Sequence, residues 1–294
     1  MTETVPIPTF PARISHRVSP QHVEDACRKT GAAAVFIRMD RASHRVSRSG
    51  KMAKKKLKVG FVGCPPEDIL ARYREDRLID LDNHYPAVRR ESQQKLPATT
   101  CAIVKRIYDN ALAFKPDILI FDQGYGKCDP ARMVSLLLKE ELGTPLIGTD
   151  NTSMAGKGTP VSDSSLPLRE KVDIILEDLV KPRRRAVDPE KAPKAGIWGV
   201  PASDFSLYDL FPDGTKIYGW LRCLENRTPA DLDLECMVDP EIPVVFFSQA
   251  FCHKNILAKH LAKKYNGLYF DLEENISGTI RAKVEAFLRF RGAV

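Results

Sequence analysis

The sequence predicts an α/β protein with two Rossmann-like lobes, each built on a parallel sheet, and a cleft between them. Short apolar runs rich in β-branched or aromatic residues, of which Ile118–Phe121 and Val244–Phe247 are the clearest, are typical of buried strands. Helical patterns separate these strands, and helical connections between strands indicate parallel pairing with right-handed crossovers. A chain of 294 residues is long enough for two such lobes.

The predicted elements fall into three regions. Residues 1–51 lack a sustained hydrophobic period and are predicted to be a disordered extension. The N-terminal lobe is expected over 52–181, and the C-terminal lobe over 195–294. The segment between them is charged and contains proline, as interdomain linkers commonly do.

Each element of the two lobes follows from local composition. Strands are predicted at 58–64, 118–121, 145–148, 195–200, 216–220, 244–247 and 267–271. Helices are predicted at 65–73, 101–114, 131–142, 168–180, 203–211, 229–237, 253–265 and 280–290. The stretch 80–95 is polar. The stretch 149–167 is rich in Ser, Thr, Gly and Asp, so it is expected to be a long loop.

The charge of the chain is concentrated at one end. Residues 1–58 hold thirteen Lys or Arg against four Asp or Glu, so the net charge of +7 becomes −2 for the remainder. A basic tail does not define a nucleic-acid-binding fold, and nucleic acid is not an expected partner. No apolar run approaches the roughly 20 residues that span a bilayer, so no membrane association is expected.

The number and spacing of the cysteines indicate the cellular compartment of the protein. The seven cysteines are an odd number, with neither dense disulfide spacing nor a secretory signal. A cytoplasmic protein is expected, in which thiols remain available for metal or redox chemistry.

Three cysteines occupy similar positions in the predicted fold. Cys128 follows a strand and precedes Asp129-Pro130, a favourable N-cap and first helical position. Cys101 stands at a predicted helix start, and Cys252 follows the strand at 244–247. Open α/β sheets bind ligands at the carboxyl ends of their strands. Soft thiolates on separate loops suit an iron–sulfur cluster better than a compact zinc site.

The sequences around these three cysteines are similar to those of a known protein family. Phe247-Ser-Gln-Ala-Phe-Cys252, followed by the segment Gly267–Leu288 with its Ile280-Arg-Ala-Lys-Val-Glu-Ala-Phe287 helix, resembles the C-terminal end of the 2-hydroxyacyl-CoA dehydratase and benzoyl-CoA reductase family. Thr100-Cys101 and Lys127-Cys128-Asp129 are similar to the first two cluster cysteines of that family. Gly63-Cys64-Pro-Pro-Glu67 resembles its first strand and turn.

The resemblance implies a cofactor and partners. In that family three cysteines bind a [4Fe–4S] cluster with one position left for substrate or water, so Cys101, Cys128 and Cys252 are the implied ligands. A second subunit of the same family and an ATP-dependent iron–sulfur activator are the implied partners. Lyase or reductase chemistry on an acyl-CoA or another small molecule, of the kind used in anaerobic metabolism, is the implied activity.

The sequence also departs from the family. The segment Gly196–Cys252 is short, and Lys283 stands where the family commonly has Arg. A non-catalytic partner subunit is therefore an open alternative. So are a metal-free metabolite-binding or regulatory protein, and an enzyme with one activated thiol.

Other residues are candidates for the same cleft. Cys64 is a further metal candidate, while His253 and Gln123 are the catalytic candidates. Tyr125 is expected to contact the cleft. His84 and Tyr85 could act as an acid or a base, but nothing in the sequence locates them relative to the cleft. Cys223 and Cys236 are expected to be structural.

Overall fold

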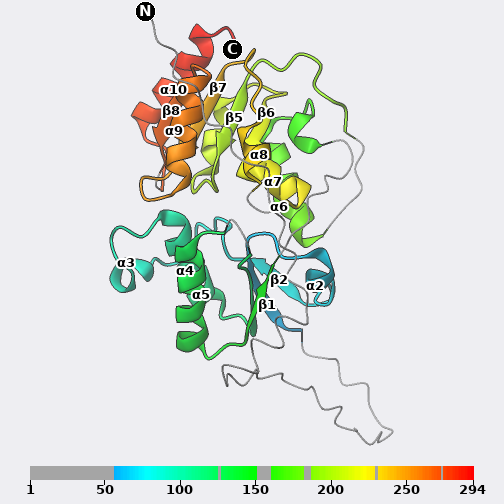
Figure 1. The fold of residues 1–294 in the computed structure, drawn as a ribbon, viewed down its shortest axis with the longest axis vertical. Coiled ribbons are helices and arrows are strands. Elements are labelled where there is room, and N and C mark those ends of the chain that lie inside the picture. The colour runs from blue at the N-terminus through cyan, green and yellow to red at the C-terminus, as the bar shows by residue number, and fades with distance from the viewer. Residues whose placement is uncertain (1–55, 125–126, 151–159, 182–186, 229–230, 273) are drawn as a thin grey trace, which may run out of the picture. The chain divides into compact units, whose positions relative to one another are not determined.

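The described residues contain two parallel sheets with helices between their strands. A computed structural model describes residues 56–294 except 125–126, 151–159, 182–186, 229–230 and 273, and Lys54–Val294 cluster together. The extension predicted at 1–51 lies outside the described residues. Both sheets are four-stranded and parallel throughout, which confirms the predicted α/β fold with two Rossmann-like lobes (Figure 1).

The first sheet has the strand order β2-β1-β3-β4. Its strands are β1 (Lys58–Val62), β2 (Arg77–Asp80), β3 (Ile118–Asp122) and β4 (Leu146–Thr149). The helices of this half are α2 (Glu67–Ala71), α3 (Ser92–Lys95), α4 (Ala102–Phe114) and α5 (Asp129–Leu142). The central strands β1 and β3 are almost fully buried, as their apolar sequences require.

The second sheet repeats this plan in the order β6-β5-β7-β8. Its strands are β5 (Gly196–Gly199), β6 (Lys216–Gly219), β7 (Val244–Ser248) and β8 (Leu268–Asp271). The accompanying helices are α6 (Leu168–Val180), α7 (Trp220–Asn226), α8 (Leu232–Cys236), α9 (Lys254–Lys264) and α10 (Gly278–Phe290), with 3-10 turns η1 (Val161–Asp163) and η2 (Phe205–Leu210). None of the helices in the described ranges is long and apolar enough to cross a membrane.

The shared strand order defines where a ligand can bind. In each sheet the chain moves from the first strand to a neighbour on one side, and then returns to pair on the other side. The order therefore reverses between β1 and β3, and again between β5 and β7. Ligands of open α/β sheets bind outside the carboxyl ends of strands at such reversals.

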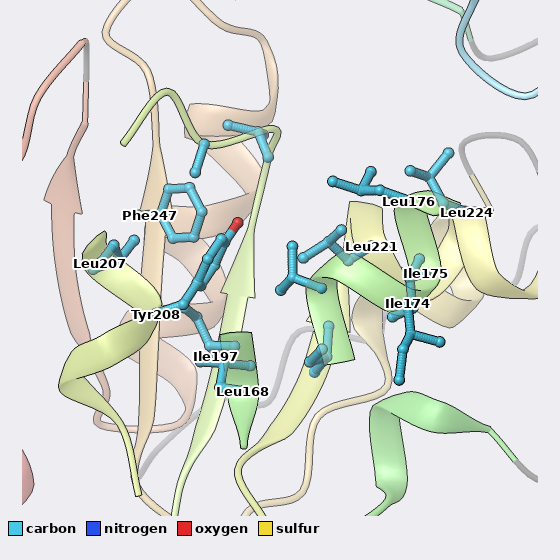
Figure 2. Packing of buried hydrophobic residues seen from close by; sticks show 14 of the residues in the cluster. Leu168, Ile174, Ile175, Leu176, Ile197, Leu207, Tyr208, Leu221, Leu224 and Phe247 are labelled. Carbon is cyan, nitrogen blue, oxygen red and sulfur yellow. The ribbon is translucent and has the colours of Figure 1, made fainter. Parts of the chain in front are cut away.

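Helix α6 connects the two halves through packing. It contacts α7, η1 and η2 of the second half as well as β2 of the first. Figure 2 shows several of its residues in one buried cluster with Tyr208 of η2, Phe247 of β7 and Leu221 of α7. The lobe boundaries at 181 and 195 stay a prediction, since the contacts of α6 extend into both halves.

Three local predictions were wrong. Strand β2 was not predicted, because only Leu78 and Ile79 are apolar in this edge strand and charged residues flank them. Helix α7 begins at Trp220, which was assigned to the preceding strand. The N-cap of α5 is Cys128, and the proposed cap Asp129 is the first helical residue.

A buried lysine in the second half predicts a pH effect on stability. The side chain of Lys171 in α6 is fully buried, and its ammonium donates to the carbonyl oxygen of Thr215 at 2.8 Å. Burial lowers the pKa of Lys171 to about 8. Between pH 8 and the ordinary lysine value the unfolded chain binds a proton that the folded chain does not, so stability rises with pH.

The comparison of wild type with Lys171→Met isolates this effect. The difference in unfolding free energy, wild type minus variant, is expected to increase by up to about 3 kcal/mol between pH 8 and 10.5. Denaturant titrations of both proteins across this range measure it. An unchanged difference would show that the lysine ammonium remains hydrated in the folded state.

Candidate functional site

Three helix N-termini bring three thiols to the same place. Cys101 is the N-cap of α4, Cys128 is the N-cap of α5, and Cys252 precedes His253, the N-cap of α9. All three line a cavity of about 170 Å³, named here the inner cysteine cavity. All three also line an adjoining cavity of about 590 Å³, named the outer cysteine cavity. The predicted site residues are thus brought together from both halves of the chain.

The local fold explains why the thiols converge. Cys128 and Cys252 follow β3 and β7, the strands that flank the two reversals of strand order. Cys101 joins them because α4 lies in the connection from β2 to β3, and such a connection begins at the carboxyl ends of the parallel strands. The backbone amide of Ile103 donates to the side-chain oxygen of Gln249 at 3.2 Å. This contact links the start of α4 to the loop that carries Cys252.

Backbone amides face each sulfur. The amide of Val104 lies toward the Cys101 sulfur, that of Ala131 toward Cys128, and that of Lys254 toward Cys252. No capping hydrogen bond closes at Cys101 or Cys128. Because these three amides point toward the sulfurs at helix N-termini, they would stabilise negative charge on the sulfurs.

Burial outweighs this effect in the free thiols. Desolvation raises the pKa of Cys101 to about 11, and it raises the pKa of both Cys128 and Cys252. Negative charge on Cys252 would further raise the pKa of Cys101 and of Cys128. An activated nucleophilic cysteine requires a lowered pKa, whereas burial raises the pKa of each of these three thiols. The enzyme with one activated thiol stays an open alternative.

The inner cysteine cavity has an apolar wall and a charged one. Trp198 at the end of β5 and Trp220 at the start of α7 contribute aromatic surface, and the segment 199–201 completes this side. The ammonium of Lys127 lies 2.7 Å from a carboxylate oxygen of Asp122, and Lys254 is paired with the buried Glu235. Each lysine therefore brings a compensating carboxylate into the cavity wall.

Two more cysteines line the inner cysteine cavity. Cys64, which was predicted at the end of the first strand, lies two residues after β1, and its side chain is buried. Cys223 on α7 is also buried, and desolvation raises the pKa of its thiol to about 12. The sequence predicts a structural role for Cys223 and does not predict that it lines the cleft. Its position could not be found from spacing, because α7 itself was not predicted.

The other candidates lie in different surroundings. His253 lines the outer cysteine cavity with the three thiols. The side-chain amide of Gln123 donates to the Ser135 hydroxyl of α5 at 2.7 Å, so it is engaged in packing. His84 and Tyr85 line a separate cavity of about 790 Å³, named here the His84 cavity. Tyr125 and the segment 151–159 lie outside the described residues.

Several residues of the site carried no recognised signal in the sequence. Lys127 and Lys254 stand one and two residues from a candidate cysteine, and that proximity could have marked them. Asp82, Trp198 and Glu235 reach the cavity only through the tertiary fold. Within the described ranges, no group of three or more His, Cys, Asp or Glu side chains is arranged to hold a single metal ion.

These observations define an α/β protein with two four-stranded parallel sheets and a cysteine-lined cavity at the carboxyl ends of their central strands. No protein-family model matches the chain, and no curated protein matches it.

Proposed function

We propose that the chain is an iron–sulfur protein whose Cys101, Cys128 and Cys252 hold a [4Fe–4S] cluster in the cleft. The observation that carries the proposal is the convergence of these three thiols, from three helix N-termini, on the same two cavities. Reductive or radical chemistry on an acyl-CoA or another small molecule is the proposed activity, in a lyase or reductase or a subunit of one. A cytoplasmic location goes with this chemistry.

The donor set suits a cluster. Thiolates are the usual cluster ligands, and the three cysteines carry no disulfide. Each cysteine of a cluster binds a different iron atom, so its ligands lie farther apart than those of one ion. The absence of a single-ion group among the described residues is compatible with that geometry. When bound, such a cluster supplies single electrons at low potential.

The surrounding residues would tune the cluster and hold its loops. Hydrogen bonds to the sulfurs set the potential of such centres, and the amides at the helix N-termini face the sulfurs. The Ser248 hydroxyl is fully buried and is also directed at Cys252. Gln249 holds the Cys252 loop against α4.

The inner cysteine cavity would serve the substrate. Its apolar side, with Trp198 and Trp220, excludes water from the reacting group. A cavity of about 170 Å³ accommodates only a small part of a large thioester, so the bulk of such a substrate would extend elsewhere. An electron-donating activator and a second subunit of the same kind are the proposed partners.

A second candidate is a metal-free metabolite-binding or regulatory protein. The raised pKa values of the three thiols favour it, because a protonated cysteine behaves as a small apolar residue. Of the three side chains, Cys101 is buried, Cys252 is half-buried and Cys128 is exposed. In this case the cysteines contribute to packing alone. Serine substitutions would then change stability without changing any bound metal.

Metal content separates the two candidates. The protein is purified without oxygen, reconstituted with iron and sulfide, and analysed for both elements and for visible absorption. About four irons per chain are expected for a cluster of this type, with most of the iron lost in Cys128→Ser. A colourless protein that stays free of iron after reconstitution would contradict the proposed function.

The matched control is Cys236→Ser. Cys236 ends α8, is half-buried, and lies on the wall of neither cysteine cavity. Its variant is expected to keep the iron content and spectrum of the wild type. Loss of iron from both variants would indicate a general effect of cysteine replacement on folding.

A further inference from the structure

Two buried carboxyl groups lie between the His84 cavity and the inner cysteine cavity. Asp80 ends β2 and lines the His84 cavity, whereas Asp82 lines the inner cysteine cavity. The two residues are 3% and 6% exposed, so neither carboxyl is freely hydrated. They are separated by a single residue, and the Asp82 amide donates to a carboxyl oxygen of Asp80 at 3.3 Å.

The pair is held in place from both sides. The Gly63 amide, at the end of β1, donates to the Asp82 carboxylate at 3.1 Å. Arg106 of α4 donates to the Asp82 carbonyl oxygen at 3.1 Å. The second carboxyl oxygen of Asp80 is buried and has no hydrogen-bond donor among the described residues. A proton shared with Asp82 would satisfy that oxygen.

The charges around the pair favour one shared proton. Burial, together with the neighbouring charge of Asp82, raises the pKa of Asp80 well above its ordinary value, and Arg106 opposes this rise. Two adjoining buried carboxyls cannot both ionise without a large electrostatic cost. Tyr85 also faces both aspartates, and burial raises its pKa to about 12, so it remains protonated. The other ionisable residues that line the His84 cavity are His84, Arg169, Asp173, Glu177, Lys181 and Asp204.

We propose that Asp80 and Asp82 form a proton relay that leads from the His84 cavity to the inner cysteine cavity. The inference rests on the proposed function, because reductive chemistry in an apolar cavity needs a source of protons. The Asp80 O–H bond breaks as its proton passes to a carboxylate oxygen of Asp82. Asp82 then transfers a proton to the reacting group in the inner cavity, and Asp80 takes a proton from water in the His84 cavity. No electron moves within the relay.

Infrared spectroscopy tests the shared proton without any cofactor. A protonated carboxyl has a C=O stretching band that an ionised carboxylate lacks. The wild-type protein is expected to retain such a band at neutral pH, and Asp80→Asn is expected to lose it. The control is Asp173→Asn, which removes a half-exposed carboxylate from the wall of the same cavity and should keep the band.

The coupling to the cysteine site is measured separately. In the iron-loaded wild type, reduction is expected to draw a proton onto Asp82. The reduction equilibrium then changes up to tenfold per pH unit, or about 59 mV for a one-electron couple. Asp82→Asn should make the potential nearly independent of pH, because the proton acceptor is removed while the amide still accepts from Gly63. Asp80→Asn is the second variant, which keeps the acceptor but removes the donor, so proton uptake on reduction should become slower.

The outcomes distinguish this inference from the proposed function. A missing band in the wild type, or one that survives in both Asn variants, overturns the shared proton. An unchanged pH dependence of the potential in Asp82→Asn, or an unchanged rate of proton uptake in Asp80→Asn, overturns the relay. A protein that binds no iron contradicts the proposed function and the coupling with it, while the infrared band still decides whether the pair holds a proton.

Discussion

Serine in place of Cys101 or Cys252 is expected to remove most of the iron from protein reconstituted without oxygen. Each cysteine would be the sole protein ligand of one iron atom, and a serine oxygen is a poorer partner for iron in a thiolate cluster. The measurement is iron and sulfide content with the visible spectrum. The expected loss is similar for both variants, although Cys101 lies on a helix of the first half and Cys252 on a loop of the second.

Cys223→Ser is the discriminating control. Cys223 lies on the wall of the same inner cavity and is buried, as Cys101 is. Its sulfur lies 3.8 Å from the carbonyl oxygen of Asp231, and it belongs to no helix N-cap. This variant is expected to keep its iron. If Cys223→Ser loses iron while Cys101→Ser keeps it, the ligand set is different from the one proposed.

Much of the fold could be predicted because its strands have strong local signals. The β3 and β7 segments are apolar, rich in β-branched or aromatic residues and central in their sheets, and both were located to within about a residue. Strand β2 lies at a sheet edge, where only one side is paired and charged residues are common. Its pairing with β1 depends on the tertiary fold rather than on its own composition.

The site was only partly predictable for a related reason. The three cysteines could be located because each lies beside a strand end or a helix start, which local patterns reveal. The opposite wall depends on α7, which begins abruptly after Gly219 at a φ of 73°. A side chain at Gly219 would also approach the Gly199 carbonyl oxygen to 2.9 Å, so glycine is required there. Sequence patterns of helices and strands do not register this kind of close approach.

Contacts between the two halves determine the geometry of the cavities. The cysteines come from both halves, so a small displacement of one sheet would separate Cys252 from Cys101 and Cys128. Arg106 crosses between the halves, since its guanidinium donates to the carbonyl oxygens of Asp82 and Ala202, each at 3.1 Å. It also donates to the Ser203 hydroxyl. One side chain therefore connects the loop after β2 to the loop after β5.

Arg106→Met is expected to lower the free energy of unfolding by about 3–4 kcal/mol, because it removes charged hydrogen bonds and leaves buried carboxyl groups without a nearby cation. The nearest carboxyls are those of Asp80 and Asp82. Denaturant titration measures the change in stability, and limited proteolysis near 181–195 measures the association of the halves.

The neighbouring Lys105→Met is the control, since the Lys105 ammonium makes an exposed contact with the Ala98 carbonyl oxygen. A change in unfolding free energy within about 0.5 kcal/mol is expected for this variant. Equal stabilities for the two variants would mean that apolar packing, such as that of α6, holds the halves together without Arg106. A selective loss in Arg106→Met would instead make this guanidinium the main polar connection between the cysteine-bearing loops.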